Sequence, residues 1–166
     1  RDVEAKLRAS EHRDSLALET RWAVRTEDLL FHINVLAPTI LHFSGHGGQE
    51  GILLQGERDA IELLSGRDLA DALRAAPPVP RLVLLNACYS EAQARALVEV
   101  VDGAIGLPAE ITDKSARTFA AQFYSALGFG RSVQDAFTQA SVLLRVKRGS
   151  GSGAGAPRLL TRKGID

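Results

Sequence analysis

The chain alternates short apolar segments typical of β-strands with longer segments whose apolar residues form one stripe, as in helices. Strands are predicted at 39–43, 79–85 and 103–107, and helices at 26–36, 65–76, 91–101, 112–127 and 132–144. Thr26, Ser65 and Thr112 are predicted to cap the helices that begin at these residues. Helices placed between strands act as crossovers that return the chain to the same end of a sheet. The order therefore predicts an α/β fold with a mainly parallel sheet and helices on both of its faces.

Two further β features lie outside this alternation. Residues 51–55 and 60–64 flank a short polar segment and predict a hairpin just beyond His46. Within 16–24 the apolar residues recur with period two, which predicts another strand near the start of the chain.

The length and composition predict one folded domain. With 166 residues, 45% of them hydrophobic, the chain can bury a core of its own. We expect that domain over 1–148, a flexible loop rich in Gly and Ser at 149–157, and a C-terminal segment of the same domain at 158–166. The stretch 145–156 is either a solvated connector or a processing or regulatory loop.

Charge and apolar content exclude several classes of partner. Lys and Arg number 20, as do Asp and Glu, so the net charge gives no reason to expect nucleic acid. No apolar run approaches the roughly 20 residues of a membrane span, and the first residues do not resemble a signal peptide. A single cysteine cannot form an internal disulfide, which fits a reducing compartment. We therefore expect a cytoplasmic protein that binds neither membrane nor nucleic acid.

Two reactive side chains follow predicted strands. His46 lies among glycines after 39–43, and Cys88 follows 79–85. Sites in parallel sheets form beyond the carboxyl ends of the strands, so we expect the two side chains to meet there. A cysteine after a buried strand is also a common small core residue, and that alternative stays open. A histidine flanked by glycines is harder to explain as part of a core.

The pair suits nucleophilic catalysis. A neighbouring imidazole raises the thiolate fraction of a cysteine, and the imidazolium can then protonate a leaving amine. The backbone N–H groups of Gly47 and Cys88 can stabilise the negative oxygen that forms on attack. The glycines around His46 lack the Lys-Ser/Thr ending of a phosphate loop, and one cysteine cannot build a thiolate zinc site. We expect no metal and no cofactor.

The order of residues along the chain distinguishes among cysteine hydrolases. All four histidines, His12, His32, His42 and His46, precede Cys88. Papain-like proteases and class I glutaminases carry the catalytic histidine after the cysteine, so both groups are excluded. His42 is the competing base, but its position inside a predicted strand favours a structural role.

Segments Leu41–Gly47 and Leu85–Ser90 together resemble the CHAT domain, a family within the caspase-like clan of cysteine proteases. The later segments Phe119–Leu127 and Gly130–Phe137 resemble the helix pair of that family. The resemblance implies a three-layer caspase-hemoglobinase sandwich, with His46 as general acid/base and Cys88 as nucleophile. It also implies that the first strand of the domain is absent from this sequence.

Specificity and partners follow less directly from the resemblance. Relatives that cut after Arg or Lys often carry Asp two residues before the nucleophile, where this chain has Asn86. We expect Asn86, Glu110 and Asp113 to contact the substrate; structural roles for Asn86 and Asp113 stay open. Domains of this kind usually act as effectors in bacterial defence or cell death, under a regulatory or sensor module. The rival functions are an inactive caspase-like scaffold and a cysteine hydrolase that acts on a small amide.

Overall fold

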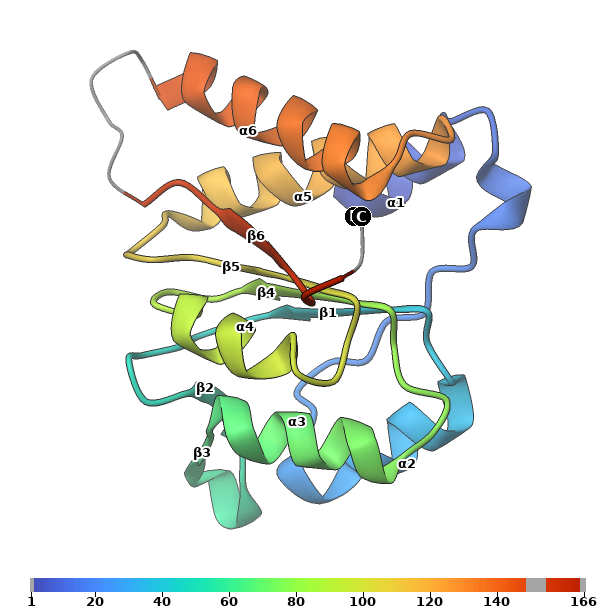
Figure 1. Ribbon diagram of the computed structural model, residues 1–166. Coiled ribbons are helices and arrows are strands. Elements are labelled where there is room, and N and C mark those ends of the chain that lie inside the picture. The colour runs from blue at the N-terminus through green and yellow to red at the C-terminus, as the bar shows by residue number, and fades with distance from the viewer. Residues whose placement is uncertain (1, 149–154, 165–166) are drawn as a thin grey trace. The chain divides into compact units, whose positions relative to one another are not determined.

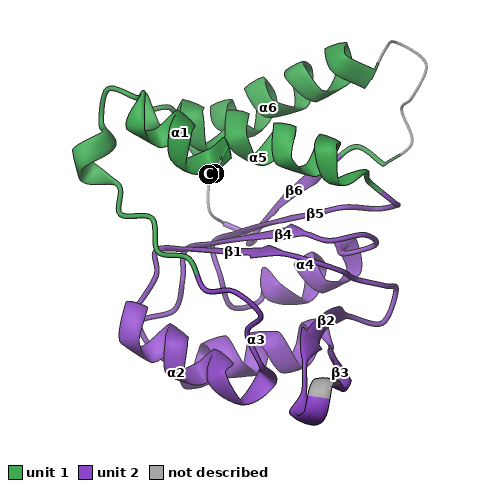
Figure 2. Ribbon diagram, turned by 180° about the vertical axis from the view of Figure 1, so that it is seen from behind, with its two compact units in different colours: residues 1–20, 111–156 green, residues 21–110, 157–166 purple. Residues whose placement is uncertain are grey.

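The computed structural model describes residues 2–148 and 155–164. The chain divides into two compact units, shown in different colours in Figure 2. Unit 1 consists of Arg1–Thr20 and Ile111–Ala156, and unit 2 consists of Arg21–Glu110 and Pro157–Asp166. His46 and Cys88 both belong to unit 2, so this unit is described first.

A four-stranded sheet forms the centre of unit 2 (Figure 1). Its order is β1-β4-β5-β6, in which β1, β4 and β5 are parallel and β6 pairs antiparallel with β5. The strand bounds are Ile40–Ser44 for β1, Leu82–Asn86 for β4, Gly103–Gly106 for β5 and Arg158–Thr161 for β6. The predicted α/β class with a mainly parallel sheet is confirmed.

The register of β1 and β4 brings their carboxyl ends together. Ser44, the last residue of β1, is the partner of Asn86, the last residue of β4. The segments that follow, with His46 in one and Cys88 in the other, therefore leave the sheet from the ends of neighbouring parallel strands, as expected for an α/β site.

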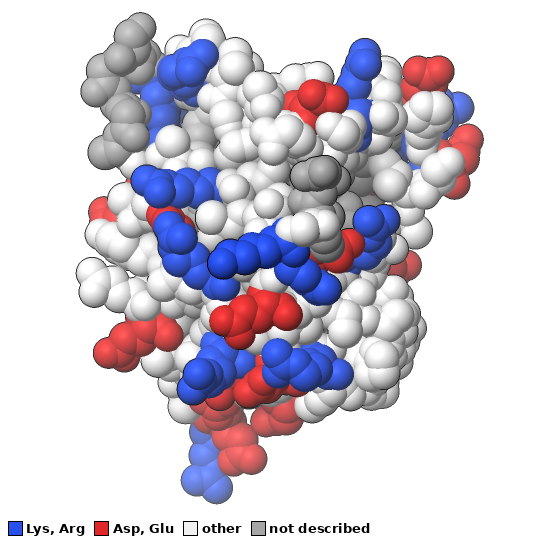
Figure 3. Space-filling view, viewed as in Figure 1, with Lys and Arg blue, Asp and Glu red and all other residues white. Residues whose placement is uncertain are grey.

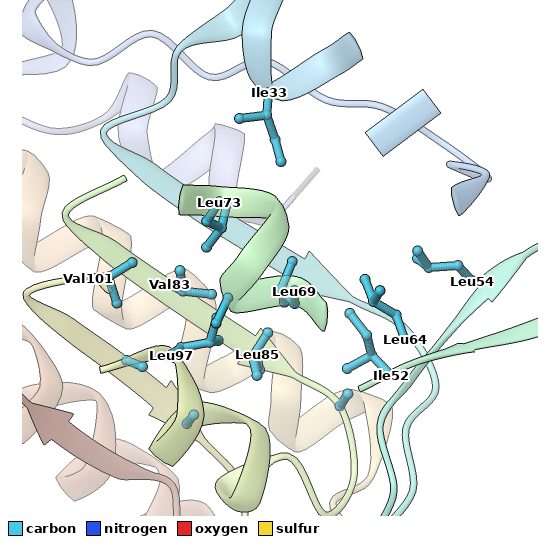
Figure 4. Packing of buried hydrophobic residues seen from close by; sticks show 14 of the residues in the cluster. Ile33, Ile52, Leu54, Leu64, Leu69, Leu73, Val83, Leu85, Leu97 and Val101 are labelled. Carbon is cyan, nitrogen blue, oxygen red and sulfur yellow. The ribbon is translucent and has the colours of Figure 1, made fainter. Parts of the chain in front are cut away.

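Three helices lie along one face of this sheet (Figure 1). They are α2 (Thr26–Leu36), α3 (Gly66–Ala75) and α4 (Glu91–Leu97). Figure 4 shows their buried apolar side chains meeting those of the strands, with Leu73 and Leu97 beside Val83 and Leu85 of β4. These four side chains are at most 1% exposed, so they form the centre of the core.

The predicted hairpin is present as a separate two-stranded sheet. Strands β2 (Ile52–Gln55) and β3 (Ile61–Leu64) pair antiparallel, joined by the short 3-10 helix η2 (Glu57–Asp59). Directly after β3, Ser65 caps α3 as predicted, because its Oγ accepts a hydrogen bond from the Asp68 N–H at 3.1 Å.

Unit 1 contains the remaining described helices. They are α1 (Asp2–Arg8), the 3-10 helix η1 (Arg13–Ser15), α5 (Asp113–Gly128) and α6 (Val133–Arg148). The Phe119 ring of α5 stacks on Phe123 and meets Phe137 of α6 edge-on. Thr112 caps α5 as predicted, and Ser132, which was predicted only as the start of the last helix, caps α6.

Several predicted elements are wrong or incomplete. Residues 16–24 form no strand: Ala23 adopts a left-handed backbone (φ 50°), and Trp22 is 85% exposed, so no core supports the period-two pattern. The cap of α2 is Arg25 rather than Thr26, and α4 ends at Leu97 rather than Val101. Helix α1 and strand β6 were not predicted. Of the predicted loop at 149–157, residues 149–154 lie outside the described part of the chain.

Among the described residues, no helix combines the length and apolar character that a bilayer crossing needs. The cytoplasmic location stays a prediction.

Candidate active site

Cys88 lies on a tight turn between β4 and α4. Ala87 before it is buried, Cys88 itself is half-buried, and Tyr89 after it has a left-handed backbone (φ 56°). A left-handed residue between strand and helix reverses the chain sharply, which leaves the Cys88 side chain at the end of the sheet.

Ser90 anchors this turn from within. Its buried Oγ lies 2.7 Å from the carbonyl oxygen of Ala87 and 3.0 Å from that of Leu85, and it accepts a hydrogen bond from the Leu107 N–H at 3.1 Å. The Glu91 N–H in turn donates to the carbonyl oxygen of Leu107 at 3.0 Å. The turn that carries Cys88 is thus bonded both to the end of β4 and to the segment after β5.

His46 lies on the loop that joins β1 to β2. The loop is held at its base, where the Gly45 N–H donates to the carbonyl oxygen of Asn86 at 3.4 Å. It is held at its end by the Leu53 N–H, which donates to the carbonyl oxygen of His46 at 3.0 Å. His46 is exposed and Cys88 is half-buried.

Gly47 brings the two loops into backbone contact. A Cβ atom built on Gly47 would lie 2.8 Å from the carbonyl oxygen of Cys88 and 2.9 Å from the Cβ of Ala87. Only a residue without a side chain permits this approach. The structure therefore brings the backbone of the His46 loop against the Cys88 turn.

The N–H of Gly47 faces away from the hairpin. Gly47 and Ile52 lie opposite each other in an antiparallel bridge, and the hydrogen bonds of this bridge are made by their neighbours. The Gly48 N–H donates to the carbonyl oxygen of Gly51, and the Leu53 N–H donates to that of His46. In such a non-hydrogen-bonded pair the N–H of each residue points away from the partner strand. The Gly47 N–H is therefore directed away from β2, as an oxyanion donor would need to be.

A buried glutamine joins the His46 loop to α4. Gln93 is 3% exposed, and its Nε2 donates to the carbonyl oxygen of Gln49 at 3.2 Å and to that of Gly48 at 3.4 Å. Neither Gln93 nor Ser90 was predicted as part of the site. For Gln93 a weak signal exists, since it lies one turn before Leu97 on the buried stripe of α4.

A pocket of about 380 Å³ adjoins these loops. It is lined by Gln49, Tyr89, Glu91, Ala92, Arg95 and Pro108. Glu91 forms ion pairs with both Arg95 and Arg158, the latter at 3.4 Å. Figure 3 shows that basic and acidic side chains alternate over the face that carries α4 and β6. No single charge sign dominates the pocket.

His42 is more buried than His46. The Nε2 of His42 is inaccessible to solvent, although the residue as a whole is half-buried, and burial lowers the pKa of His42 to about 4. A buried imidazole in β1 stays neutral near pH 7 and supports the predicted structural role for His42.

The three predicted substrate-binding residues lie in different settings. Asn86 ends β4 and is 6% exposed, so its side chain presents little surface, while its carbonyl oxygen holds the His46 loop. Glu110 is exposed at the end of a unit 2 segment. Asp113 is the first residue of α5 in unit 1, where its charge also suits the helix amino terminus.

Among the residues that the structure describes, no three His, Cys, Asp or Glu side chains gather in a way that could hold a metal ion.

Residues 2–150 match the model of the CHAT domain. The chain belongs to the CHAT domain family. A curated relative, a "Roc-COR-CHAT protease" from an unknown prokaryotic organism, is 25% identical over 142 residues; the match covers 81% of this chain and only 13% of the relative. The CHAT assignment inferred from the motifs around His46 and Cys88 is thus confirmed.

A solved structure shares the fold of this CHAT domain. It is a secreted C11 cysteine protease from Bacteroides thetaiotaomicron, determined in complex with an irreversible peptide inhibitor. The TM-score is 0.57 at 20% identity, and the match covers 81% of this chain and 44% of the other. The comparison confirms a fold similar to that of caspase-like cysteine proteases.

Proposed function

We propose that this CHAT domain is a cysteine endopeptidase in which His46 and Cys88 form the catalytic dyad. The observation that carries the proposal is the contact of the His46 loop with the Cys88 turn at Gly47, beyond the ends of two neighbouring parallel strands. The reactive thiol and the exposed imidazole thereby belong to loops that are fixed against each other by backbone contacts.

The dyad would cleave a peptide bond in two stages. His46 takes the thiol proton of Cys88, and Sγ attacks the substrate carbonyl carbon to give a tetrahedral oxyanion. The N–H groups of Gly47 and Cys88 stabilise that oxygen. As the C–N bond breaks, His46 gives its proton to the departing amine, and a thioester remains. Water then attacks the thioester, His46 takes a proton from it and returns one to Sγ, and the acid product leaves.

We further propose Asn86, Glu110 and Asp113 as residues that contact the substrate. Asn86 would act at the base of the site, because its side chain is almost fully buried two residues before Cys88. A strictly basic preference at the cleavage site would not be expected from a neutral Asn86. The β2-β3 hairpin beside the His46 loop favours an extended peptide as substrate, since strand edges bind extended backbone.

Regulation by another module is part of the proposal. The chain spans 13% of the curated relative, whose name joins a CHAT protease to Roc and COR parts. An endopeptidase that was always active would damage its host, so we expect a partner or linked module to control it. A role as effector in bacterial defence or cell death, in the cytoplasm, fits such control.

Cleavage of a proteome-derived peptide library tests the dyad. We expect Cys88→Ala and His46→Ala each to abolish cleavage, whereas His12→Ala, which changes an exposed histidine in unit 1, leaves it intact. Labelling of Cys88 by a thiol-reactive peptide probe provides a second readout. Cleavage that survives Cys88→Ala contradicts the proposal. A chain that neither cuts any peptide nor labels, even with candidate activators, favours the inactive scaffold.

A further inference from the structure

One buried side chain ties the loop of His46 to the helix that follows Cys88. Gln93 lies in α4, and its Nε2 donates to the carbonyl oxygens of Gly48 and Gln49. These two residues follow Gly47 directly, so the bonds act on the segment that carries both His46 and the proposed oxyanion donor.

The acceptors determine how the amide of Gln93 is oriented. With the amide turned over, Oε1 would face two carbonyl oxygens and no donor, which is unfavourable. In the observed orientation Oε1 is buried and has no hydrogen-bond partner among the described residues. A buried acceptor without a partner lowers stability, so an apolar side chain would serve packing better at this position. The Nε2 contacts therefore give the reason for an amide there.

The start of helix α3 packs against the backbone of α4 at Gln93. A Cβ atom built on Gly66, the first residue of α3, would lie 2.6 Å from the Cα of Gln93. The backbone of α4 is therefore packed closely at this point. Gln93 is also 3% exposed. It is therefore held between α3, which packs against its backbone, and the His46 loop, to which its side chain is hydrogen-bonded.

We propose that Gln93 is a positioning residue for the peptidase reaction, whose amide holds Gly48 and Gln49 so that His46 and the Gly47 N–H face Cys88. This inference rests on the proposed function. A positioning role and a packing role predict different effects on stability when the amide of Gln93 is removed. The carbonyl groups of Gly48 and Gln49 lie in half-buried and exposed residues and can be solvated, so removing Nε2 costs stability little while it releases the loop.

The decisive variant is Gln93→Met, which keeps the shape of the side chain and removes both donors. We expect kcat to fall about 10- to 100-fold with KM little changed, as for a misplaced catalytic group. The melting temperature should stay equal or rise, since the buried unpaired Oε1 is gone. Leu97→Ala, one turn further along the same buried stripe, is the matched control: it should lower the melting temperature and leave kcat of the folded protein unchanged.

Hydrogen exchange in the full chain gives a readout that does not depend on the peptidase activity of the chain. The N–H groups of Gly48 and Leu53 are bonded within the loop, so Gln93→Met should speed their exchange and Leu97→Ala should not do so selectively. Should Gln93→Met fail to fold, Gln93→Asn, which keeps the amide but is one methylene too short to reach both carbonyls, provides the same comparison.

The outcomes separate this inference from the proposed function. Unchanged kcat in a folded Gln93→Met variant, or a parallel loss of kcat and melting temperature, overturns the role of Gln93. Unchanged exchange in the loop overturns it as well, whether or not the chain cuts peptides. If Cys88→Ala still cleaves, the dyad is wrong and a positioning role in that reaction falls with it, even where exchange shows that Gln93 holds the loop.

Discussion

The Oγ of Ser90 accepts a hydrogen bond from the backbone N–H of Leu107 at 3.1 Å, and this bond joins the Cys88 turn to the segment after β5. Both residues are at most 2% exposed, so water cannot replace the lost acceptor. We expect Ser90→Ala to lower the free energy of unfolding by about 1 to 3 kcal/mol. Denaturant unfolding measures the change.

The matched control for that change is Ser141→Ala. The Oγ of Ser141 is buried without a hydrogen-bond partner in the described part of the chain, so its removal should leave stability equal or slightly higher. Equal losses in the two variants would contradict the anchoring role of Ser90.

The close approach at Gly47 predicts a severe effect of a single methyl group. In Gly47→Ala the new Cβ would meet the carbonyl oxygen of Cys88 at 2.8 Å, and the backbone on both sides must shift. Misplacement on this scale can cost about 100-fold in kcat. Gly48→Ala is the control, since no heavy atom lies within 4 Å of its added Cβ. Similar kcat values for the two variants in a peptide assay would falsify the close approach as a catalytic requirement.

The buried imidazole of His42 predicts a pH-dependent stability. Its pKa is about 4 in the folded state against 6.5 unfolded, so the unfolded chain binds the proton first as pH falls. The contribution of the buried, neutral His42 to the free energy of unfolding is therefore fully present above pH 6.5. It is lost as the pH falls from 6.5 to 4, and the total loss is at most about 3 kcal/mol. His42→Leu should flatten the unfolding free energy over this interval. An unaltered pH profile in that variant would show that His42 does not titrate as described.

The capping hydrogen bond of Thr112 predicts a modest loss of stability when it is removed. Its Oγ1 accepts a hydrogen bond from the Ser115 N–H at 3.2 Å and caps α5, so Thr112→Ala should cost about 1 kcal/mol. Thr138→Ala removes a hydroxyl that donates back to the Gln134 carbonyl oxygen within its own helix, α6, and it should change stability little. Thermal unfolding of both variants checks the difference; a larger loss in Thr138→Ala would contradict the capping role.

The elements nearest the candidate site were predictable because local sequence specifies them. The apolar runs of β1 and β4 end where glycines and a cysteine replace β-formers, and the parallel order of the sheet brings those ends together. Ser65 and Thr112 precede apolar stripes and act as caps. Such signals depend on residues close in sequence, so one chain suffices to find them.

The features that were missed depend on distant parts of the chain. Gln93 holds residues more than forty positions earlier, and the role of Ser90 requires Leu107 to lie beside it; neither neighbour is visible in sequence. Strand β6 is short and becomes a strand only by pairing with β5. Residues 16–24 show the reverse case, in which a strand-like pattern with an exposed Trp22 forms no strand.

The division of unit 2 between two stretches of sequence limits how it can be dissected. A recombinant fragment that ended at Glu110 would retain β1, β4 and β5 but lack β6, which contributes the ladder from Arg158 to Thr161. The outer edge of β5 would then present unpaired N–H and C=O groups, a template for strand exchange between molecules. Such a fragment should self-associate, and a synthetic peptide spanning 157–164 supplied in trans should suppress that association.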